Sequence, residues 1–466
     1  MSNRLPLRIC IGALALFCVV GVLRSAAIAG LHVPLDPNEG WNAYHALQAM
    51  TGGALYPPRD SFLFNNYPPL SFYVVGALGS LIGDNIVAAR ILSLLATLAI
   101  AAGIYLAARR MKSSVAPAVF AALAFVAGLL IFTDYVGMDD PQLLGHAVAM
   151  GGLLLLVDER RTPARLVTAA LLMSLAFFIK HNLVALPLAL TLWLAVSDRR
   201  SAVWFAGAGI VFGLAGLVLF RIAYHIDLFG VLNSPRTYSF ALLSNAVRNW
   251  LLWADVSLFG LAVLLYLRRR DSGVVLCAIY AAVAIAVGIG FAGGAGVDMN
   301  IWFDAMIALG LATALVLDRL APSEAMRGLV AAAYMLPLIV GIVLNWDSAW
   351  LERDFWLHPM REETATGRSD IAFLEAQKGP ALCETLALCY WAGKREEVDV
   401  FNIGQAYATH RQSDDTLVHN IAVRRYGAVA FDSLDDFALT QRIKQTILKF
   451  YRIDHANDEG VFLVPR

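Results

Sequence analysis

The sequence predicts an α-helical polytopic membrane protein with about eleven transmembrane helices and a small α/β domain at its C-terminal end. Two observations favour this fold class. Hydrophobic residues make up 59% of the 466 residues and charged residues only 15%, whereas soluble proteins carry about 25% charged residues. Apolar stretches close to the roughly 20 residues that a membrane helix needs recur through the first 345 residues. The composition therefore argues against a soluble enzyme and against a disordered chain, which needs low hydrophobicity and high charge.

The apolar stretches define the predicted transmembrane domain, residues 1–346. Lys and Arg concentrate in alternate loops between them, including residues 109–112, 199–200 and 268–270. Positively charged loops stay in the cytoplasm, so we expect the N-terminus inside the cell and the C-terminus outside. The expected spans lie near residues 9–30, 85–108, 115–132, 142–157, 165–180, 183–197, 202–222, 249–267, 273–291, 301–317 and 327–345.

One further apolar stretch, residues 67–83, is not predicted to cross. A crossing there would move the basic residues 109–112 to the outer side. We therefore expect an interfacial or partly inserted helix on the outer face, beginning near Pro68 and Pro69, since proline suits a first helical turn. The first span could be a cleaved signal peptide, because residues 25–30 include small residues. An uncleaved anchor is favoured because a whole membrane domain follows it.

Residues 347–466 contain no stretch long enough to cross a membrane and form the predicted α/β domain on the outer side. Strand-forming runs at residues 398–403 and 428–431 alternate with helical patterns such as residues 434–451. Two cysteines also lie in this domain, where an oxidising compartment would permit a disulfide, and two buried thiols are the equally weighted alternative. The two cysteines are Cys383 and Cys389.

Acidic residues gather in the predicted outer loops. Asp36 and Glu39 lie three apart at the start of a helix, where capping and the helix dipole would explain an acid by themselves. The second outer loop carries Asp134, Asp139 and Asp140 within a few residues of one another, next to apolar spans. Capping and solvation explain this loop too, but together the two loops favour the polar wall of a cavity at the membrane surface.

Two cations accompany these acids. Lys180, followed by His181, interrupts an apolar run, and Arg90 lies near the outer end of its span. Charged groups at membrane depth are costly and usually face a cavity or a partner, whereas snorkelling of both side chains is the simpler alternative. The last outer loop adds Asp298 and Asn300 beside several glycines. All these groups are predicted on the same side of the membrane.

Carboxylates and cations beside an apolar wall would suit an amphiphilic substrate with a phosphate head, such as a sugar joined to a polyprenyl phosphate. Lys180 or Arg90 would neutralise the phosphate, while the lipid tail would lie between helices. A carboxylate would take the proton from an acceptor hydroxyl as it attacks the anomeric carbon. The leaving phosphate is already a stable anion, so no general acid is needed, and a direct displacement would invert the anomeric centre.

Four segments of about the first 200 residues form an ordered series. They are Asp36-Pro37-Asn38-Glu39-Gly40 with Tyr44; Asn66-Tyr67-Pro68-Pro69 with Gly83-Asp84 and Ala89-Arg90-Ile91-Leu92-Ser93; Asp139-Asp140-Pro141; and Phe178-Ile179-Lys180. In order and spacing they resemble the GT-C superfamily of integral-membrane glycosyltransferases, and within it the bacterial relatives of protein O-mannosyltransferases and lipid A aminoarabinose transferases. The resemblance implies a multi-span core, a catalytic acid in the first outer loop, a polyprenyl-phosphate sugar donor and often an outer C-terminal domain.

The family acid is usually an adjacent Asp-Glu pair, whereas here two residues separate Asp36 from Glu39. We therefore expect Asp36 to be the base and Glu39 to position the acceptor or a metal, although which of them is the base stays open. A divalent cation held by Asp36, Glu39 and Asp139 is also left open. Other residues expected to line the cavity or bind the acceptor are Tyr44, Tyr67, Asp134, Asp139, Asp140, His181, Asp298 and Asn300.

The predicted partners are the lipid-linked sugar donor, membrane lipid, and an envelope acceptor that is a lipid, a polysaccharide or a protein, at the outer (periplasmic) face of a bacterial inner membrane. The balance of 36 basic and 36 acidic residues argues weakly against nucleic acid. A transporter or flippase of lipid-linked sugars is the alternative, but transporters commonly show internal repeats and sites near the midplane. A non-enzymatic subunit of an envelope-assembly complex is a third hypothesis.

Overall fold

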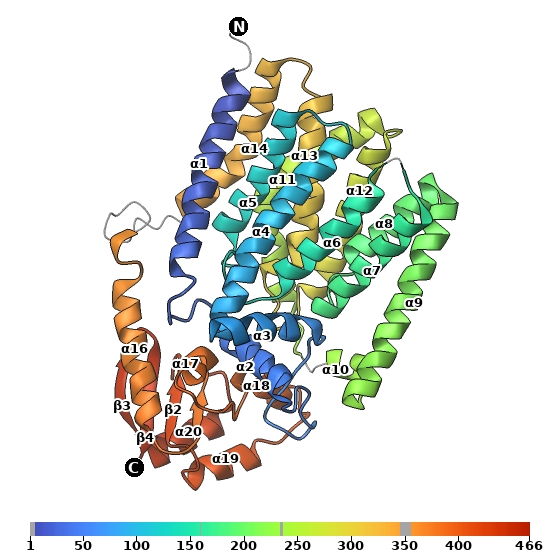
Figure 1. The fold of residues 1–466 in the computed structure, drawn as a ribbon. Coiled ribbons are helices and arrows are strands. Elements are labelled where there is room, and N and C mark those ends of the chain that lie inside the picture. Colours follow the sequence, from blue (N-terminus) through green and yellow to red (C-terminus); the bar gives the residue numbers. More distant parts are fainter. Residues whose placement is uncertain (1–4, 159, 234–235, 345–355) are drawn as a thin grey trace.

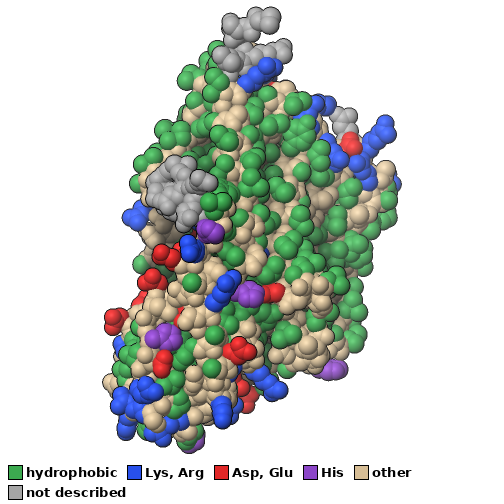
Figure 2. Space-filling model, turned by 60° about the vertical axis from the view of Figure 1, so that its left-hand side comes forward, with side chains coloured by type: hydrophobic (Ala, Val, Ile, Leu, Met, Phe, Trp, Pro, Cys, Tyr) green, Lys and Arg blue, Asp and Glu red, His purple; other side chains and the backbone are tan. Residues whose placement is uncertain are grey.

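The computed structural model describes residues 5–158, 160–233, 236–344 and 356–466 of the chain. A bundle of long helices forms its larger part, and a small domain that contains a β-sheet lies below one end of the bundle (Figure 1). Apolar side chains cover most of the bundle surface in one view, whereas charged side chains gather on the small domain and at the opposite tip (Figure 2). This distribution is typical of a multi-pass membrane protein.

Each of the eleven predicted spans coincides with a helix of the bundle. Among the described residues, eight helices are long and apolar enough to cross a membrane, and α6, α7 and α8 are shorter apolar helices. The fold class predicted from the sequence is confirmed. The helices are α1 (Leu5–Ile28), α4 (Asn85–Arg110), α5 (Val115–Phe132), α6 (Gln142–Leu156), α7 (Pro163–Ile179), α8 (Ala185–Ser197), α9 (Arg199–Tyr224), α11 (Phe240–Arg268), α12 (Ser272–Phe291), α13 (Phe303–Arg319) and α14 (Glu324–Leu344).

Short polar side chains set the starts of several bundle helices. The Asp84 carboxylate accepts hydrogen bonds from the second and third backbone amides of α4, and Asp271 caps α12 in the same way. Thr162 caps α7, which has proline in its first turn, and Asp198 caps α9. Such caps satisfy amides that have no partner within the helix, so the helix boundaries follow from local sequence.

The basic loops meet at one end of the bundle. Arg319 at the end of α13 forms an ion pair with Asp271 before α12, with 2.7 Å between Nη1 and Oδ2, and Ser114 before α5 donates a hydrogen bond to Asp318 near the end of α13. The acidic loops therefore lie at the opposite end, which also carries the small domain (Figure 1). We call this opposite end the domain-bearing end.

Two short helices, α2 (Asn38–Thr51) and α3 (Leu70–Ile82), lie across the domain-bearing end (Figure 1). The orientation of α3 across this end agrees with the interfacial helix that the positions of the basic loops predicted for residues 67–83. Two short segments, α10 (Leu228–Leu232) and η1 (Met299–Trp302), lie between bundle helices. Beyond the bundle, α16 (Arg361–Ala376) precedes the strands of the small domain.

The small domain is built around a four-stranded sheet of order β1-β2-β4-β3. Strands β1 (Ala381–Cys383) and β2 (Ala428–Phe431) are parallel, and α17 (Leu386–Trp391), α18 (Val400–Ala408) and α19 (Asp415–Ala422) connect them. Helix α20 (Gln441–Phe450) leads to the antiparallel hairpin of β3 (Tyr451–Asn457) and β4 (Gly460–Pro465). The predicted domain boundary at residues 346 and 347 lies outside the described residues.

Two predictions for this domain are wrong and one alternative is resolved. Residues 398–403 are not a strand, because the Asp399 side chain accepts a hydrogen bond from the Asn402 amide and starts α18. The helix expected at 434–451 begins only at Gln441, where Thr440 provides the cap. The two cysteines left open by the sequence, Cys383 and Cys389, form a disulfide.

The small domain packs directly on α2. The Trp41 indole donates a hydrogen bond of 3.0 Å to Asp399 Oδ2, and the Tyr44 hydroxyl donates one of 2.8 Å to the Lys394 carbonyl. The Trp391 indole donates to Asp84, the cap of α4, over 2.9 Å. These contacts join segments more than 300 residues apart, so the last part of the chain covers the first loop.

Candidate active site

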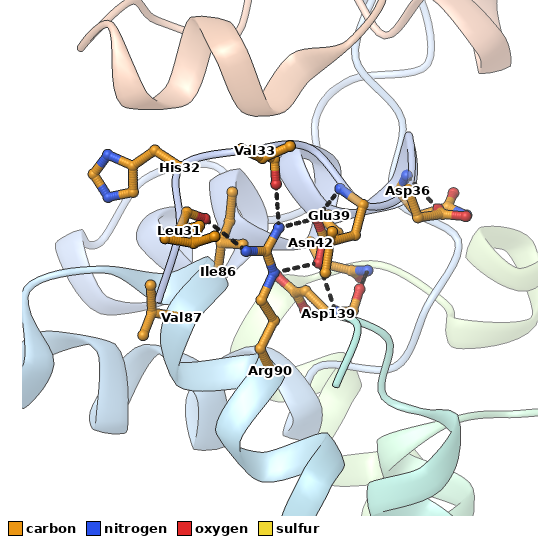
Figure 3. A network of polar contacts seen from close by, with 12 residues as sticks. Leu31, His32, Val33, Asp36, Glu39, Asn42, Ile86, Val87, Arg90 and Asp139 are labelled. Carbon is orange, nitrogen blue, oxygen red and sulfur yellow. Dashed lines mark hydrogen bonds and ion pairs between the residues drawn. The ribbon is translucent and has the colours of Figure 1, made fainter. Parts of the chain in front are cut away.

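A buried ion pair holds the first loop of the domain-bearing end. Arg90 on α4 donates from Nε to Glu39 Oε1 over 2.7 Å and from Nη2 to Glu39 Oε2 over 2.5 Å. It also donates to the carbonyls of Leu31 and Val33 over 2.8 and 2.7 Å, and Figure 3 shows the guanidinium enclosed by these acceptors. Both side chains of the pair have no exposed surface. The loop that carries the acids is therefore fixed to α4.

Glu39 also accepts two hydrogen bonds from backbone amides. Its Oε1 accepts from the Asp139 amide over 3.1 Å and its Oε2 from the Leu35 amide over 2.9 Å. Glu39 thus ties the first acidic loop to the second one. Because Arg90 and Glu39 are fully buried and bound to each other, this geometry does not support Arg90 as a phosphate ligand or Glu39 as a base.

Asp36 lies on the far side of Glu39 from Arg90 and points away from the ion pair (Figure 3). Its Oδ1 accepts a hydrogen bond of 2.8 Å from the Asn38 amide. Burial raises the pKa of Asp36 to about 6, and the carboxylates of Asp140 and Glu39 add to this effect against the hydrogen bonds from Asn38. A carboxylate with such a pKa is a stronger base than an ordinary aspartate.

Lys180 ends α7 and is buried with a carboxylate partner. Its Nζ lies 2.9 Å from Asp140 Oδ2 and 3.8 Å from the centre of the Tyr67 ring. A carboxylate at this distance favours the charged form of a lysine. The lysine is therefore a protonated point charge inside the protein, of the kind that neutralises an anion.

Tyr135 shows that acids from different loops share one neighbourhood. Burial raises the pKa of this tyrosine far above its ordinary value, and the carboxylates of Asp140, Asp298 and Asp36 raise it further, as does Tyr67. These side chains come from four separate loops of the domain-bearing end. The charges of Asp36, Asp140 and Asp298 thus all act on Tyr135, and Lys180 contacts Asp140 and Tyr67 of the same neighbourhood.

His181 lies beside this cluster. Its ring centre is 6.0 Å from that of Tyr67, and burial lowers its pKa to about 4, with Lys180 and Arg236 contributing. Histidine with such a pKa is neutral at physiological pH. Among the described residues, the buried atoms Nδ1 of His181 and Oδ1 of Asn182 have no hydrogen-bond partner, so both can bind a polar substrate.

Other predicted cavity residues lie in different surroundings. Tyr44 is buried against the small domain, so it does not line the cluster. Asp139 is buried behind Glu39, and burial, with the neighbouring carboxylates, raises its pKa far above the ordinary value. Asp134 and Asp298 are exposed at the surface, and Asn300 is half-buried in η1.

No cluster of three or more His, Cys, Asp or Glu side chains with the arrangement of a metal site occurs in the described part of the chain. The three acids considered for a divalent cation are separated by their bonding. Glu39 is bound to Arg90, Asp139 is buried behind it, and Asp36 points away from both (Figure 3).

An apolar groove lies next to the turn that carries Lys180, although Lys180 itself does not line it. It has a volume of about 350 Å³ and lies between α7, α8 and α9. Phe177 and Phe178, just before Lys180, and Leu183 and Val184, just after it, all line the groove. The buried cation therefore stands at the turn between the two helices that form the groove wall.

The chain has the fold of solved structures of ArnT and of an archaeal oligosaccharyltransferase, in agreement with the resemblance predicted from the sequence. The PMT_2 family model, described as dolichyl-phosphate-mannose-protein mannosyltransferase, matches residues 66–226. No curated protein sequence matches the chain significantly.

Three solved structures share this fold. ArnT from Cupriavidus metallidurans bound to undecaprenyl phosphate has 15% sequence identity and a TM-score of 0.65, with 97% of this chain and 98% of ArnT covered. Its apo state gives 14% identity and the same TM-score, with 97% of each chain covered. The oligosaccharyltransferase AglB from Archaeoglobus fulgidus, in complex with an inhibitory peptide and a dolichol-phosphate, has 12% identity and a TM-score of 0.50, covering 89% of this chain and 69% of AglB.

Several residues around the site were not found by sequence reasoning. Tyr135 lies between two acids of the second loop, and its position within that acidic segment was the available signal. Arg236 lies in the connecting segment between α9 and α11, and its charge acts on His181, Tyr67 and Asp399. Asp399 comes from the small domain, and nothing in the sequence pairs it with Trp41.

Proposed function

We propose that the protein is a membrane glycosyltransferase that moves a sugar from a polyprenyl-phosphate donor to a hydroxyl group of an envelope acceptor. The observation that carries the proposal is the buried Lys180, paired with Asp140, at the turn of an apolar groove and in the same cluster as Asp36. A cation next to an apolar groove suits a lipid phosphate. A carboxylate of raised pKa beside it suits proton abstraction.

Two interactions are proposed for the donor. Its phosphate would bind at Lys180, where the ammonium group neutralises an anion as a point charge, and Oδ1 of Asn182, which follows in the chain and has no partner among the described residues, would accept a hydrogen bond from a sugar hydroxyl. Its isoprenoid tail lies in the groove of α7, α8 and α9. ArnT, which has the same fold, was solved with undecaprenyl phosphate bound, and this supports a lipid phosphate as donor.

The reaction is a single displacement. Asp36 accepts the proton of the acceptor hydroxyl as its oxygen forms a bond to the anomeric carbon. The bond between that carbon and the phosphate oxygen breaks, and the polyprenyl phosphate leaves as an anion next to Lys180. Preorganised charge at the leaving group lowers the barrier, and attack from the opposite face inverts the anomeric centre.

The other predicted residues have supporting roles. Glu39 and Arg90 hold the loop that carries Asp36, and Tyr67 packs over Lys180. Asp298 and Asn300, at the open edge of the cluster, are placed to contact the acceptor. The acceptor is a lipid, a polysaccharide or a protein of the envelope.

The proposal includes an orientation. Because the basic loops gather at the end opposite the site, that end faces the cytoplasm, and the site and the small domain face the periplasm of a bacterial inner membrane. The disulfide of the small domain supports this placement, since disulfides persist in oxidising compartments.

The test is replacement of Asp36 by Asn in the purified full-length protein. We expect transfer of sugar from a polyprenyl-phosphate donor to fall by about 10²- to 10⁴-fold, the usual contribution of a general base. Asp60→Asn, an exposed acid of the same end, is the matched control and should retain activity. Movement of the lipid-linked sugar across vesicles without any new glycosidic bond would instead identify a flippase, and unchanged transfer by Asp36→Asn would contradict the proposed base.

A further inference from the structure

The turn that begins α17 lies against the backbone of α2. A side chain at Gly40 would place its Cβ 2.1 Å from the Ala387 nitrogen and 2.3 Å from the Leu386 carbonyl carbon, so only glycine fits there. Gly40 directly follows Glu39 and is four residues from Asp36. The small domain therefore touches the catalytic loop through main chain, which cannot move aside as a side-chain tip can.

The same turn is closed by the disulfide. Cys383 ends β1 and Cys389 lies within α17, six residues later in the chain. Leu386 and Ala387, whose backbone meets Gly40, lie between the two cysteines. The bridge thus encloses the residues that contact α2, and both cysteines are buried.

Further contacts connect α17 to the helix that carries Arg90. The Tyr390 hydroxyl accepts a hydrogen bond of 3.2 Å from the Asn85 amide at the start of α4. Trp391 donates to Asp84, and it stacks on His32 with 4.9 Å between ring centres. The segment therefore spans both partners of the buried ion pair, since α2 carries Glu39 and α4 carries Arg90.

We infer that α17, closed by the Cys383–Cys389 disulfide, is a positioning element that holds the Asp36 loop in its catalytic geometry. The inference rests on the proposed function and extends it, because the outer domain then serves the chemistry although none of its residues reacts. Displacement of a catalytic group by about 1 Å costs roughly 100-fold in rate. Loss of the bridge removes the covalent closure of the turn whose main chain meets Gly40.

The main experiment compares the full-length wild type with the Cys383→Ala/Cys389→Ala double variant. Hydrogen exchange should become faster in residues 36–45 and in α17 but stay unchanged in the bundle helices. The kcat should fall by about 100-fold while the donor KM changes less than about twofold, since no residue of the small domain lines the groove. Unchanged exchange in residues 36–45, or an unchanged kcat, overturns the inference.

A second variant leaves the bridge intact. Gly40→Ala should push α17 away and reproduce the loss of kcat, whereas Gly30→Ala, with no atom within 4 Å of its added Cβ, is the control on the preceding segment. If hydrogen exchange in the cysteine variant is fast throughout the protein, that variant has lost its fold, and the Gly40→Ala variant then tests the inference. Equal kcat values for Gly40→Ala and Gly30→Ala would overturn it. Failure of the proposed function would appear separately, as wild-type protein that forms no glycosidic bond while the exchange differences persist.

Discussion

Replacement of Arg90 by Met tests the role of the buried ion pair. Methionine keeps an unbranched apolar side chain at this position but lacks the guanidinium group. Four hydrogen bonds are lost, two to Glu39 and one each to the Leu31 and Val33 carbonyls. The Glu39 carboxylate would then remain without exposed surface and without a counter-charge. We expect the first loop to separate from α4.

The magnitude follows from that burial. Removing one partner of a buried ion pair costs about 3–5 kcal/mol, because an uncompensated charge remains inside the protein. Removing both charges avoids this penalty, so the Glu39→Met/Arg90→Met double variant should be more stable than Arg90→Met. The exposed pair of Arg425 and Glu397, with 2.9 Å between its atoms, provides the control, and Arg425→Met should cost less than about 1 kcal/mol.

The assay is the free energy of unfolding in detergent micelles, combined with the donor KM. The reasoning is wrong if Arg90→Met is no less stable than Arg425→Met, or if the double variant is as unstable as the single one. The kinetics separate the two roles considered for Arg90. A stable double variant with a strongly raised donor KM would restore Arg90 as a phosphate ligand, whereas we expect its donor KM to stay near that of the wild type.

Three further outcomes are expected. Since Asp36 must be ionised to accept a proton and its pKa is about 6, the transfer rate should fall as the pH drops through about 6 and be level above it; a flat profile down to about pH 4 would exclude this group. Gly209→Leu fills the groove and displaces about two methylenes of the lipid tail, at about 0.8 kcal/mol each. The donor KM should therefore rise about tenfold. Gly207→Leu is the control, because Gly207 also has free space around it but does not line the groove, and this variant should leave the donor KM unchanged. Burial lowers the pKa of His455, but bonds to Asp370 and a neighbouring acid raise it overall. Protonated His455 therefore stabilises the fold at low pH, and this stabilisation is lost as the pH rises. His455→Ala should lower the melting temperature more at about pH 6 than at about pH 8.

The sequence predicted the membrane fold well because its signals are local. Apolar length, alternating basic loops and capping residues act within one helix or one loop, and they placed every span on a helix. The prediction that residues 67–83 do not cross the membrane also followed from the positions of the basic residues alone. The strand expected at residues 398–403 was wrong because a single cap, Asp399, outweighs β-propensity there.

The candidate site was predicted only in part, because pairing between distant residues leaves no local trace. The sequence singled out both Glu39 and Arg90, yet it could not show that the two neutralise each other. It also placed Lys180 and Asp140 on the same side of the membrane without identifying them as partners, and the fold brings them to 2.9 Å. Residue type indicated which groups are unusual at membrane depth, and only tertiary structure shows which of them remain free to act.

The contact between Trp41 and Asp399 joins parts of the chain that leave the ribosome far apart in time. During synthesis the bundle helices are made first, while the segment that covers the first loop is still inside the ribosome. Contacts of such long sequence separation form late in folding. A nascent or truncated chain therefore exposes an unfinished site, and the first loop acquires its cover only after the last hundred or so residues have been synthesised and have folded.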